Sequence, residues 1–162
     1  MAGMTDLRKE VPAVSVAVVR GATVLLVKRA LPPSQGFYAF PGGKVEAGET
    51  LEEAARRELM EETALAARNF RPLETIFIAG AAEGHPVDYR LTVFGADHAG
   101  GEPQASDDAE TAAFYTLAEM AALPLADSVF TIATELLARG EKSRRLTPRP
   151  ALQPTNCFAT KA

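Results

Sequence analysis

The clearest structural signal in the chain lies in residues 43–65, GKVEAGETLEEAARRELMEETAL. From Glu49 to Thr63 this stretch is rich in Glu, Ala, Leu and Arg and contains no Gly or Pro, so it predicts an α-helix. Thr50 is a suitable N-cap, and Glu53 follows it at the spacing of a capping box. We therefore expect a helix whose start is well defined and whose two faces can be assigned.

The acidic residues of this predicted helix lie on an unexpected face. At about 100° per residue, one side of the helix carries the residues expected to be buried: Leu51, Ala54 and Ala55. The same side continues into three acids: Glu58, Glu61 and Glu62. Acids that only solvate a helix should lie opposite its apolar side. The alternative, a charged surface helix with no further role, is therefore disfavoured.

Carboxylates three and four residues apart on a helix repel one another, and the repulsion grows when they are partly buried. A hard divalent cation relieves it, and magnesium prefers carboxylate, water and phosphate oxygens. Gly42 could aim a backbone carbonyl at the same ion, because glycine permits unusual backbone conformations. Arg57, four residues before Glu61, could orient the acids or meet a phosphate. The pattern therefore indicates a metal site.

The segment resembles the Nudix box, G-x5-E-x7-R-E-U-x-E-E-x-G-U, in which U is a large apolar residue. The matching positions are Gly43, Glu49, Arg57, Glu58, Leu59, Glu61, Glu62 and Leu65. Ala64 departs from the pattern, because the family has a glycine there that ends the helix in a left-handed conformation. An alanine in that geometry costs about 1 kcal/mol, unless the helix runs on slightly.

The resemblance implies a Nudix α/β/α sandwich with a mixed central sheet, covering roughly Val11 to Ala138. It implies Mg²⁺, with Mn²⁺ as a substitute, held by Gly42, Glu58, Glu61 and Glu62. Glu58 is alternatively the base that deprotonates water, Arg57 would hold the glutamates, and Glu49 would support the metal site from outside. Many members use a further acid beyond the box, and Asp108 stands at the expected place, with Asp107 and Glu110 as rivals. The candidate catalytic residues are thus Arg57, Glu58, Glu61 and Asp108.

Outside the box, hydrophobic patterns and turn residues predict the other elements. Strands are expected at Val11–Val19, Thr23–Lys28, Phe70–Ile78, Tyr89–Ala96 and Ala112–Thr116, and helices at Leu117–Leu123 and Ala126–Ala138. Residues 41–43 are expected to be irregular. We divide the chain into a domain, residues 1–139, and a basic C-terminal tail, residues 140–162, which is either solvated and disordered or a docking or dimer segment.

Three further residues are candidates for substrate binding: Arg29, Tyr38 and Lys44. Arg29, like Lys28, ends a predicted strand and could reach phosphates, and Lys44 lies inside the glycine loop. The aromatic residues before the box, Phe37, Tyr38 and Phe40, could stack on a base. We expect Phe40 to pack in the core and keep Tyr38 as the candidate. The two histidines, His85 and His98, have no partner at ligand spacing, so we expect ordinary loop residues.

Composition narrows the class of protein. With 162 residues, 47% of them apolar, the chain suits one soluble domain. The net charge of −4 disfavours nucleic-acid binding, but a metal can join an acidic site to a phosphorylated small molecule. A single cysteine, Cys157, excludes an intrachain disulfide and fits the cytoplasm. The sequence shows neither a signal peptide nor an apolar stretch of the roughly 18 residues that suggest a membrane span.

The expected reaction is attack of water on phosphorus in a nucleoside diphosphate linked to another group. Residues 31–43, LPPSQGFYAFPGG, look like bacterial family members described as ADP-ribose pyrophosphatases. Removal of oxidised nucleoside triphosphates is the main alternative, and a nucleotide-sensing module without catalysis is another. Isoprenoid diphosphate isomerisation should need a cysteine in the site, whereas Cys157 lies in the tail. The resemblance also makes a homodimer an expected form.

Overall fold

The computed structural model describes residues 8–31 and 34–146. In chain order the elements are β1 (Glu10–Arg20), β2 (Thr23–Arg29), β3 (Tyr38–Ala39), β4 (Gly42–Lys44), α1 (Leu51–Thr63), β5 (Ala66–Ile78), the 3₁₀-helix η1 (Gly80–Glu83), β6 (Asp88–Gly100), β7 (Ala109–Tyr115), α2 (Leu117–Met120) and α3 (Val129–Leu146). None of the helices in these residues is long and apolar enough to cross a membrane.

The seven strands form one mixed sheet. Its main order is β3-β2-β1-β6-β5, with β4 paired to β1 and β7 paired to β2. The central pair, β1 and β6, is parallel, whereas the other pairs are antiparallel. β1 pairs with β4 through residues 13–15 and with β2 through residues 19–20, so one strand organises both halves of the sheet.

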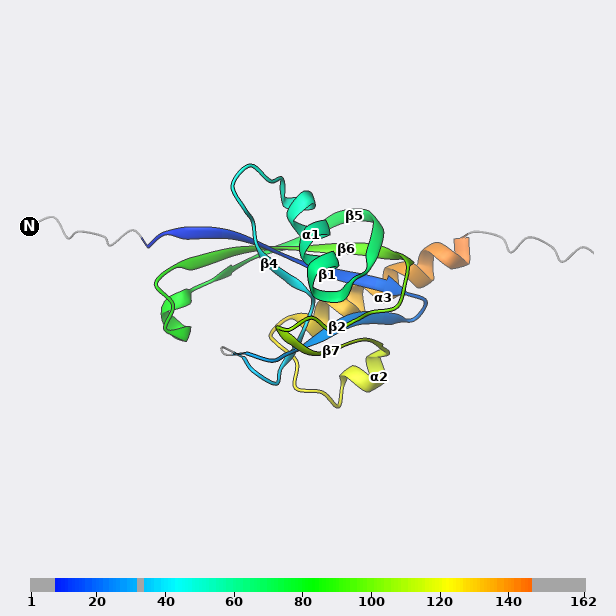
Figure 1. Cartoon of the computed structure of the whole chain (residues 1–162). Helices are drawn as coiled ribbons and strands as arrows, with labels where there is room; N and C mark the ends of the chain where they lie inside the picture. The colour runs from blue at the N-terminus through cyan, green and yellow to red at the C-terminus, as the bar shows by residue number, and fades with distance from the viewer. Residues whose placement is uncertain (1–7, 32–33, 147–162) are drawn as a thin grey trace, which may run out of the picture.

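Alternate residues of β1 enter two separate cores. Val14, Val16 and Val18 pack with Ala54 and Leu59 of α1 on one face of the sheet. Ala17 packs on the opposite face, with the α3 residues Ile132, Ala133 and Leu136. The sheet therefore lies between α1 and α3 (Figure 1), which confirms the expected α/β/α sandwich with a mixed sheet. We call these the α1 face and the α3 face.

Two local predictions were wrong. Residues 41–43 were expected to be irregular, but Gly42 and Gly43 belong to β4 and pair with Ser15 and Val14. A Cβ on Gly42 would lie 2.1 Å from the Val14 carbonyl oxygen, so only glycine allows this close approach. Leu51 was placed on the buried side of α1, but its side chain is exposed because it stands in the first turn, ahead of the buried stripe.

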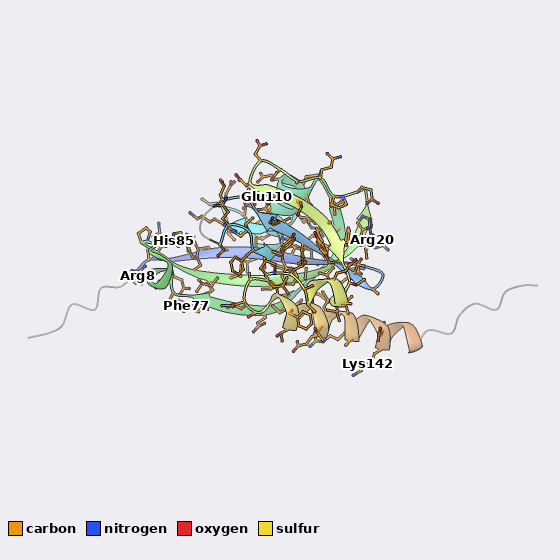
Figure 2. The ribbon with its side chains drawn as sticks, turned by 90° about the horizontal axis from the view of Figure 1, so that it is seen from below. Arg8, Arg20, Phe77, His85, Glu110 and Lys142 are labelled. Atoms are coloured by element: carbon orange, nitrogen blue, oxygen red, sulfur yellow. The ribbon has the colours of Figure 1, made fainter. Side chains whose placement is uncertain are left out.

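The ends of several elements also differ from the prediction. β5 and β6 form a longer hairpin than expected, and Figure 2 shows the labelled residues Arg8, Phe77 and His85 near its tip. α3 continues through Gly140 to Leu146, so residues 140–146 of the expected tail are helical. The rest of the tail, residues 147–162 with Cys157, lies outside the described residues. So do residues 1–7, on which the expectation about a signal peptide rests.

Candidate active site

The start of α1 is fixed by reciprocal hydrogen bonds, as the sequence predicted. The Thr50 side chain accepts a hydrogen bond from the Glu53 backbone N–H at 3.2 Å. The Glu53 carboxylate accepts one from the Thr50 N–H at 2.7 Å, which lowers the pKa of Glu53. This capping box orients the following two turns, which carry the charged residues of the site.

Arg57 lies at the centre of a carboxylate network. Its Nε and Nη2 donate to the two carboxylate oxygens of Glu49 at 2.6 and 3.0 Å. Its Nη1 donates to Glu58 at 2.9 Å and to Glu61 at 3.2 Å, and Nη2 also reaches the Lys44 carbonyl at 3.1 Å. The hydrogen bonds with Glu49 raise the pKa of Arg57 and lower that of Glu49. One guanidinium therefore joins the loop before α1 to acids on its second and third turns.

Glu58 packs against the backbone of β4. Its side chain is only 14% exposed, and a Cβ on Gly43 would lie 2.4 Å from its Oε1. Any side chain at position 43 would therefore displace this carboxylate. Glycine at position 43 thus leaves room for the Glu58 carboxylate, and a larger residue would shift that carboxylate rather than the backbone.

Glu62 is the acid with the most perturbed environment. Burial raises its pKa from 4.5 to about 7, and the negative charges of Glu58 and Asp108 add to this effect. A 3.3 Å hydrogen bond from the Gly42 N–H and the charge of Arg29 act in the opposite direction. Glu61 differs, because its side chain is 58% exposed at the edge of the site.

The donors around Glu62 fit a hard divalent cation. In the part of the chain that the structure describes, no three His, Cys, Asp or Glu side chains are grouped so as to hold a metal ion directly. Magnesium, however, commonly uses one or two protein carboxylates and completes its shell with water and phosphate oxygens. Glu58 and Glu62 are such a pair, and the raised pKa of Glu62 shows that its negative charge lacks sufficient compensation. A cation here would supply it.

The loop after β6 is fastened to the end of α1. The Gln104 N–H donates to the Thr63 carbonyl at 2.9 Å, and the Ser106 N–H donates to the Glu62 carbonyl at 3.2 Å. These two bonds occupy carbonyls that the helix itself leaves unpaired. Ala64 ends the helix in the left-handed conformation, with φ 57°. The helix therefore does not run on past this position, and the alanine adopts the backbone geometry for which the family uses glycine. Sequence reasoning missed this attachment because it uses only backbone groups.

The same loop brings Asp108 toward Glu62. The Asp108 carbonyl accepts a hydrogen bond from the Ala30 N–H at 3.1 Å, which ties the loop to the end of β2. Asp108 and Arg29 both act electrostatically on Glu62. The rival Glu110 instead forms an ion pair with Lys28 at 2.7 Å. Asp107 and Asp108 are both exposed, but it is Asp108 whose charge acts on Glu62. Asp108 and Arg29 thus lie close enough to Glu62 to act on its charge.

Lys44 and Tyr38 are not brought to this cluster. Strand alternation directs Lys44 away from the face on which Gly43 meets Glu58, and its Nζ lies 5.9 Å from the Tyr89 ring centroid. Tyr38 packs edge-on against Tyr115, with ring centroids 5.7 Å apart, in the core of the α3 face. The sheet therefore separates the Tyr38 ring from the acids. Phe40 is buried in that same core, as expected.

The histidines do not take part in the cluster of acids. His85 lies in the loop after η1, as predicted, with its ring 6.1 Å from that of Tyr89. His98 was expected in a loop but belongs to β6, where its Nε2 lies 2.8 Å from the Gly101 carbonyl oxygen.

Comparison with known proteins gives one consistent result. A family profile described as "NUDIX domain" matches residues 9–136. An ADP-ribose pyrophosphatase from Methanocaldococcus jannaschii is 40% identical over 110 residues, 65% of this chain and 63% of that protein. A protein named putative 8-oxo-dGTP diphosphatase 2 from Mycobacterium tuberculosis is 39% identical over 92 residues, 56% of this chain and 63% of that protein. This chain thus spans less than two thirds of either relative.

Among solved structures, a MutT NUDIX hydrolase from Burkholderia pseudomallei is similar with a TM-score of 0.70 and 30% sequence identity. The similarity covers 79% of this chain and 98% of that one. The residues that the family profile matches, 9–136, include all seven strands and the helix α1 that carries the acids.

Proposed function

Because the chain belongs to the Nudix family, we propose that it hydrolyses the diphosphate bond of a nucleoside diphosphate linked to another moiety, with ADP-ribose as the first substrate to test. The observation that carries this proposal is the partly buried pair of carboxylates, Glu58 and Glu62, beside the glycine strand β4. Such a pair attracts a hard cation, and a cation attracts a diphosphate.

We propose Mg²⁺ as the cation, with Mn²⁺ as a substitute. Glu58 and Glu62 would hold it, assisted by Glu61 and the Gly42 carbonyl. When bound, the ion supplies charge neutralisation of the diphosphate and a lowered pKa for the attacking water. Arg57 keeps Glu58 in place through its 2.9 Å hydrogen bond. Because Arg29 acts electrostatically on Glu62, we propose that its guanidinium contacts the substrate phosphates.

We assign proton removal from water to Asp108. Its backbone is fixed by Ala30, and its charge acts on Glu62, so its carboxylate lies near the proposed metal site. Glu58, the alternative base, already accepts a hydrogen bond from Arg57. An acid with an exposed side chain can also pass the proton on to solvent.

The similarity to a protein named as an 8-oxo-dGTP diphosphatase favours a second candidate, hydrolysis of oxidised nucleoside triphosphates to monophosphate and pyrophosphate. Both candidates use the same acids and cation, and they differ only in the group beyond the cleaved bond. A module that binds nucleotides without hydrolysing them is the third possibility.

Product release from ADP-ribose, nucleotide sugars, dinucleoside polyphosphates and oxidised nucleoside triphosphates, with and without Mg²⁺, tests the proposal. The Glu62→Gln variant should lose at least about 100-fold in kcat. Glu52→Gln is the matched control, because Glu52 lies on the outer side of the same helix and pairs with Arg56. Tight nucleotide binding without turnover by the wild type would instead favour the sensing module.

A further inference from the structure

The turn between β2 and β3 places Phe37 beside Arg29. β2 and β3 are antiparallel, with Lys28 opposite Tyr38 and Val27 opposite Ala39. A glycine bulge ends this pairing, since the Arg29 N–H donates to the Phe37 carbonyl at 3.0 Å while the Arg29 carbonyl accepts from the Gly36 N–H at 2.9 Å. Gly36, with φ 83°, and Phe37 thus oppose Arg29 together, and Phe37 keeps the position across from it. Residues opposite each other in antiparallel strands share a face of the sheet and stand about 5 Å apart.

Phe37 therefore shares the α1 face with the acids. Leu25, on the same side of β2 as Arg29, packs against α1. Arg29 acts electrostatically on Glu62, and the Ala30 N–H is bonded to Asp108. The Phe37 ring is thus one cross-strand step from Arg29, which faces the proposed phosphate site.

The exposure of Phe37 distinguishes it from the aromatic residues that follow. Phe40 is 7% exposed in the core of the α3 face, and the partly buried Tyr38 packs against that core and on Tyr115, whereas Phe37 is 44% exposed. Leu31, in the same connection, is also exposed. A single exposed aromatic side chain is ordinary on a protein surface. One beside an arginine and a carboxylate cluster offers a flat apolar surface next to a place for phosphate.

We propose that Phe37 determines specificity by stacking on the nucleobase of the substrate, while Arg29 contacts the adjoining phosphate. This inference rests on the proposed function and deepens it, because it requires a substrate that carries an aromatic base. It also replaces Tyr38, the aromatic residue singled out from the sequence, with its neighbour on the opposite face. Stacking favours substrates that carry a nucleobase over substrates that lack one. It distinguishes only weakly among the bases, since every base has a flat face.

The test compares Phe37→Ala with Phe37→Trp and Phe77→Ala. Phe77 is a matched control, because it is an exposed strand phenylalanine near the tip of the β5–β6 hairpin, where Figure 2 shows it close to His85 and Arg8. For the substrate that the wild type cleaves, Phe37→Ala should raise KM about 10- to 100-fold and change kcat only a few-fold. Phe37→Trp should restore KM, and Phe77→Ala should leave both constants within about twofold of the wild type.

Two competitive inhibitors separate stacking from general damage. In Phe37→Ala the inhibition constant of AMP, which has a base, should rise by the same factor as KM. That of ribose 5-phosphate, which has none, should stay within about twofold of the wild-type value. Equal weakening of both inhibitors, or a Phe37→Ala variant that behaves like Phe77→Ala, would overturn the inference while leaving the hydrolase proposal intact.

If the wild type turns over none of the substrates, the proposed function fails and binding of AMP becomes the test. Equilibrium dialysis with AMP should then show binding to the wild type and to Phe37→Trp, and a 10- to 100-fold weaker affinity for Phe37→Ala. Equal affinity for the wild type and Phe37→Ala, or no AMP binding to the wild type, would overturn the role of Phe37.

Discussion

The Nε of Arg57 lies 2.6 Å from Oε1 of Glu49, a residue eight positions earlier and outside α1. The contact is bidentate, because Nη2 reaches the second oxygen at 3.0 Å. It holds the loop before the helix against its second turn while the remaining nitrogen, Nη1, orients Glu58. Glu49 and Arg57 thus act on the candidate metal site through Glu58.

Arg57→Lys should lower kcat by about 10-fold or more, because lysine cannot contact Glu49 and Glu58 in the same forked geometry. Arg56→Lys is the control, since Arg56 pairs with Glu52 on the outer side of the helix and should keep nearly normal activity. Steady-state kinetics with Mg²⁺ measures both. An equal loss of kcat in the two variants would show that the effect comes from reduced helix stability rather than from the contact with Glu49 and Glu58.

In the metal-free protein, Glu62 should make the free energy of unfolding depend on pH. Burial raises the pKa of the folded-state carboxyl from 4.5 to about 7, so the folded protein holds this proton more tightly than the unfolded chain does. Its contribution to stability is therefore present below about pH 4.5 and lost as the pH rises toward 7. The loss is on the order of 3 kcal/mol, and Glu62→Gln should remove it.

Thermal unfolding in EDTA between pH 5 and 8 measures this effect. We expect Glu62→Gln to be more stable than the wild type at pH 8, with the difference shrinking toward pH 5. Added Mg²⁺ should raise the wild-type melting temperature more than that of the variant. Parallel pH curves for the two proteins would contradict the assignment of the raised pKa to Glu62.

Ala64→Gly should stabilise the protein. Ala64 has φ 57°, a left-handed conformation that costs an alanine about 1 kcal/mol more than a glycine. For a chain of this length, relief of that strain corresponds to a rise of about 2–4 °C in melting temperature. Ala66→Gly, at an exposed position two residues later in β5, should lower it instead. Calorimetry on the two variants compares the same chemical change in opposite backbone contexts.

Asp108→Asn should reduce kcat by about 10- to 1,000-fold with little change in stability, because the backbone bond to Ala30 remains. The neighbouring Asp107→Asn is the control and should stay close to wild type. A larger effect in Asp107→Asn would transfer the role to that residue.

The amphipathic pattern of α1, its N-cap and the central strands could all be predicted from the sequence, since they depend on local propensity and periodicity. The pattern also placed Glu58 and Glu62 toward the sheet, and both are partly buried. Local rules failed where a partner strand decides the structure. Gly42 and Gly43 have low strand propensity but form β4, because β1 offers a close antiparallel neighbour.

Tyr38 and Lys44 show a second limit of sequence reasoning. Each is close in sequence to Gly42 and Gly43, which precede the acids of α1. Strand alternation nevertheless turns both side chains away from Glu58. A shift of one residue in register would have reversed their positions. The role of Asp108 was expected from family resemblance, whereas its backbone contact with Ala30 depends on the folded arrangement of two distant segments.

The two adjacent glycines of β4 are constrained by different neighbours. A side chain on Gly42 would meet the main chain of Val14, whereas one on Gly43 would meet the carboxylate of Glu58. Mutations one position apart should therefore produce distinct defects, a poorly assembled sheet in one case and a folded but inactive protein in the other. In a population of natural or engineered variants, selection for abundance would remove changes at Gly42, and only selection for turnover would remove those at Gly43.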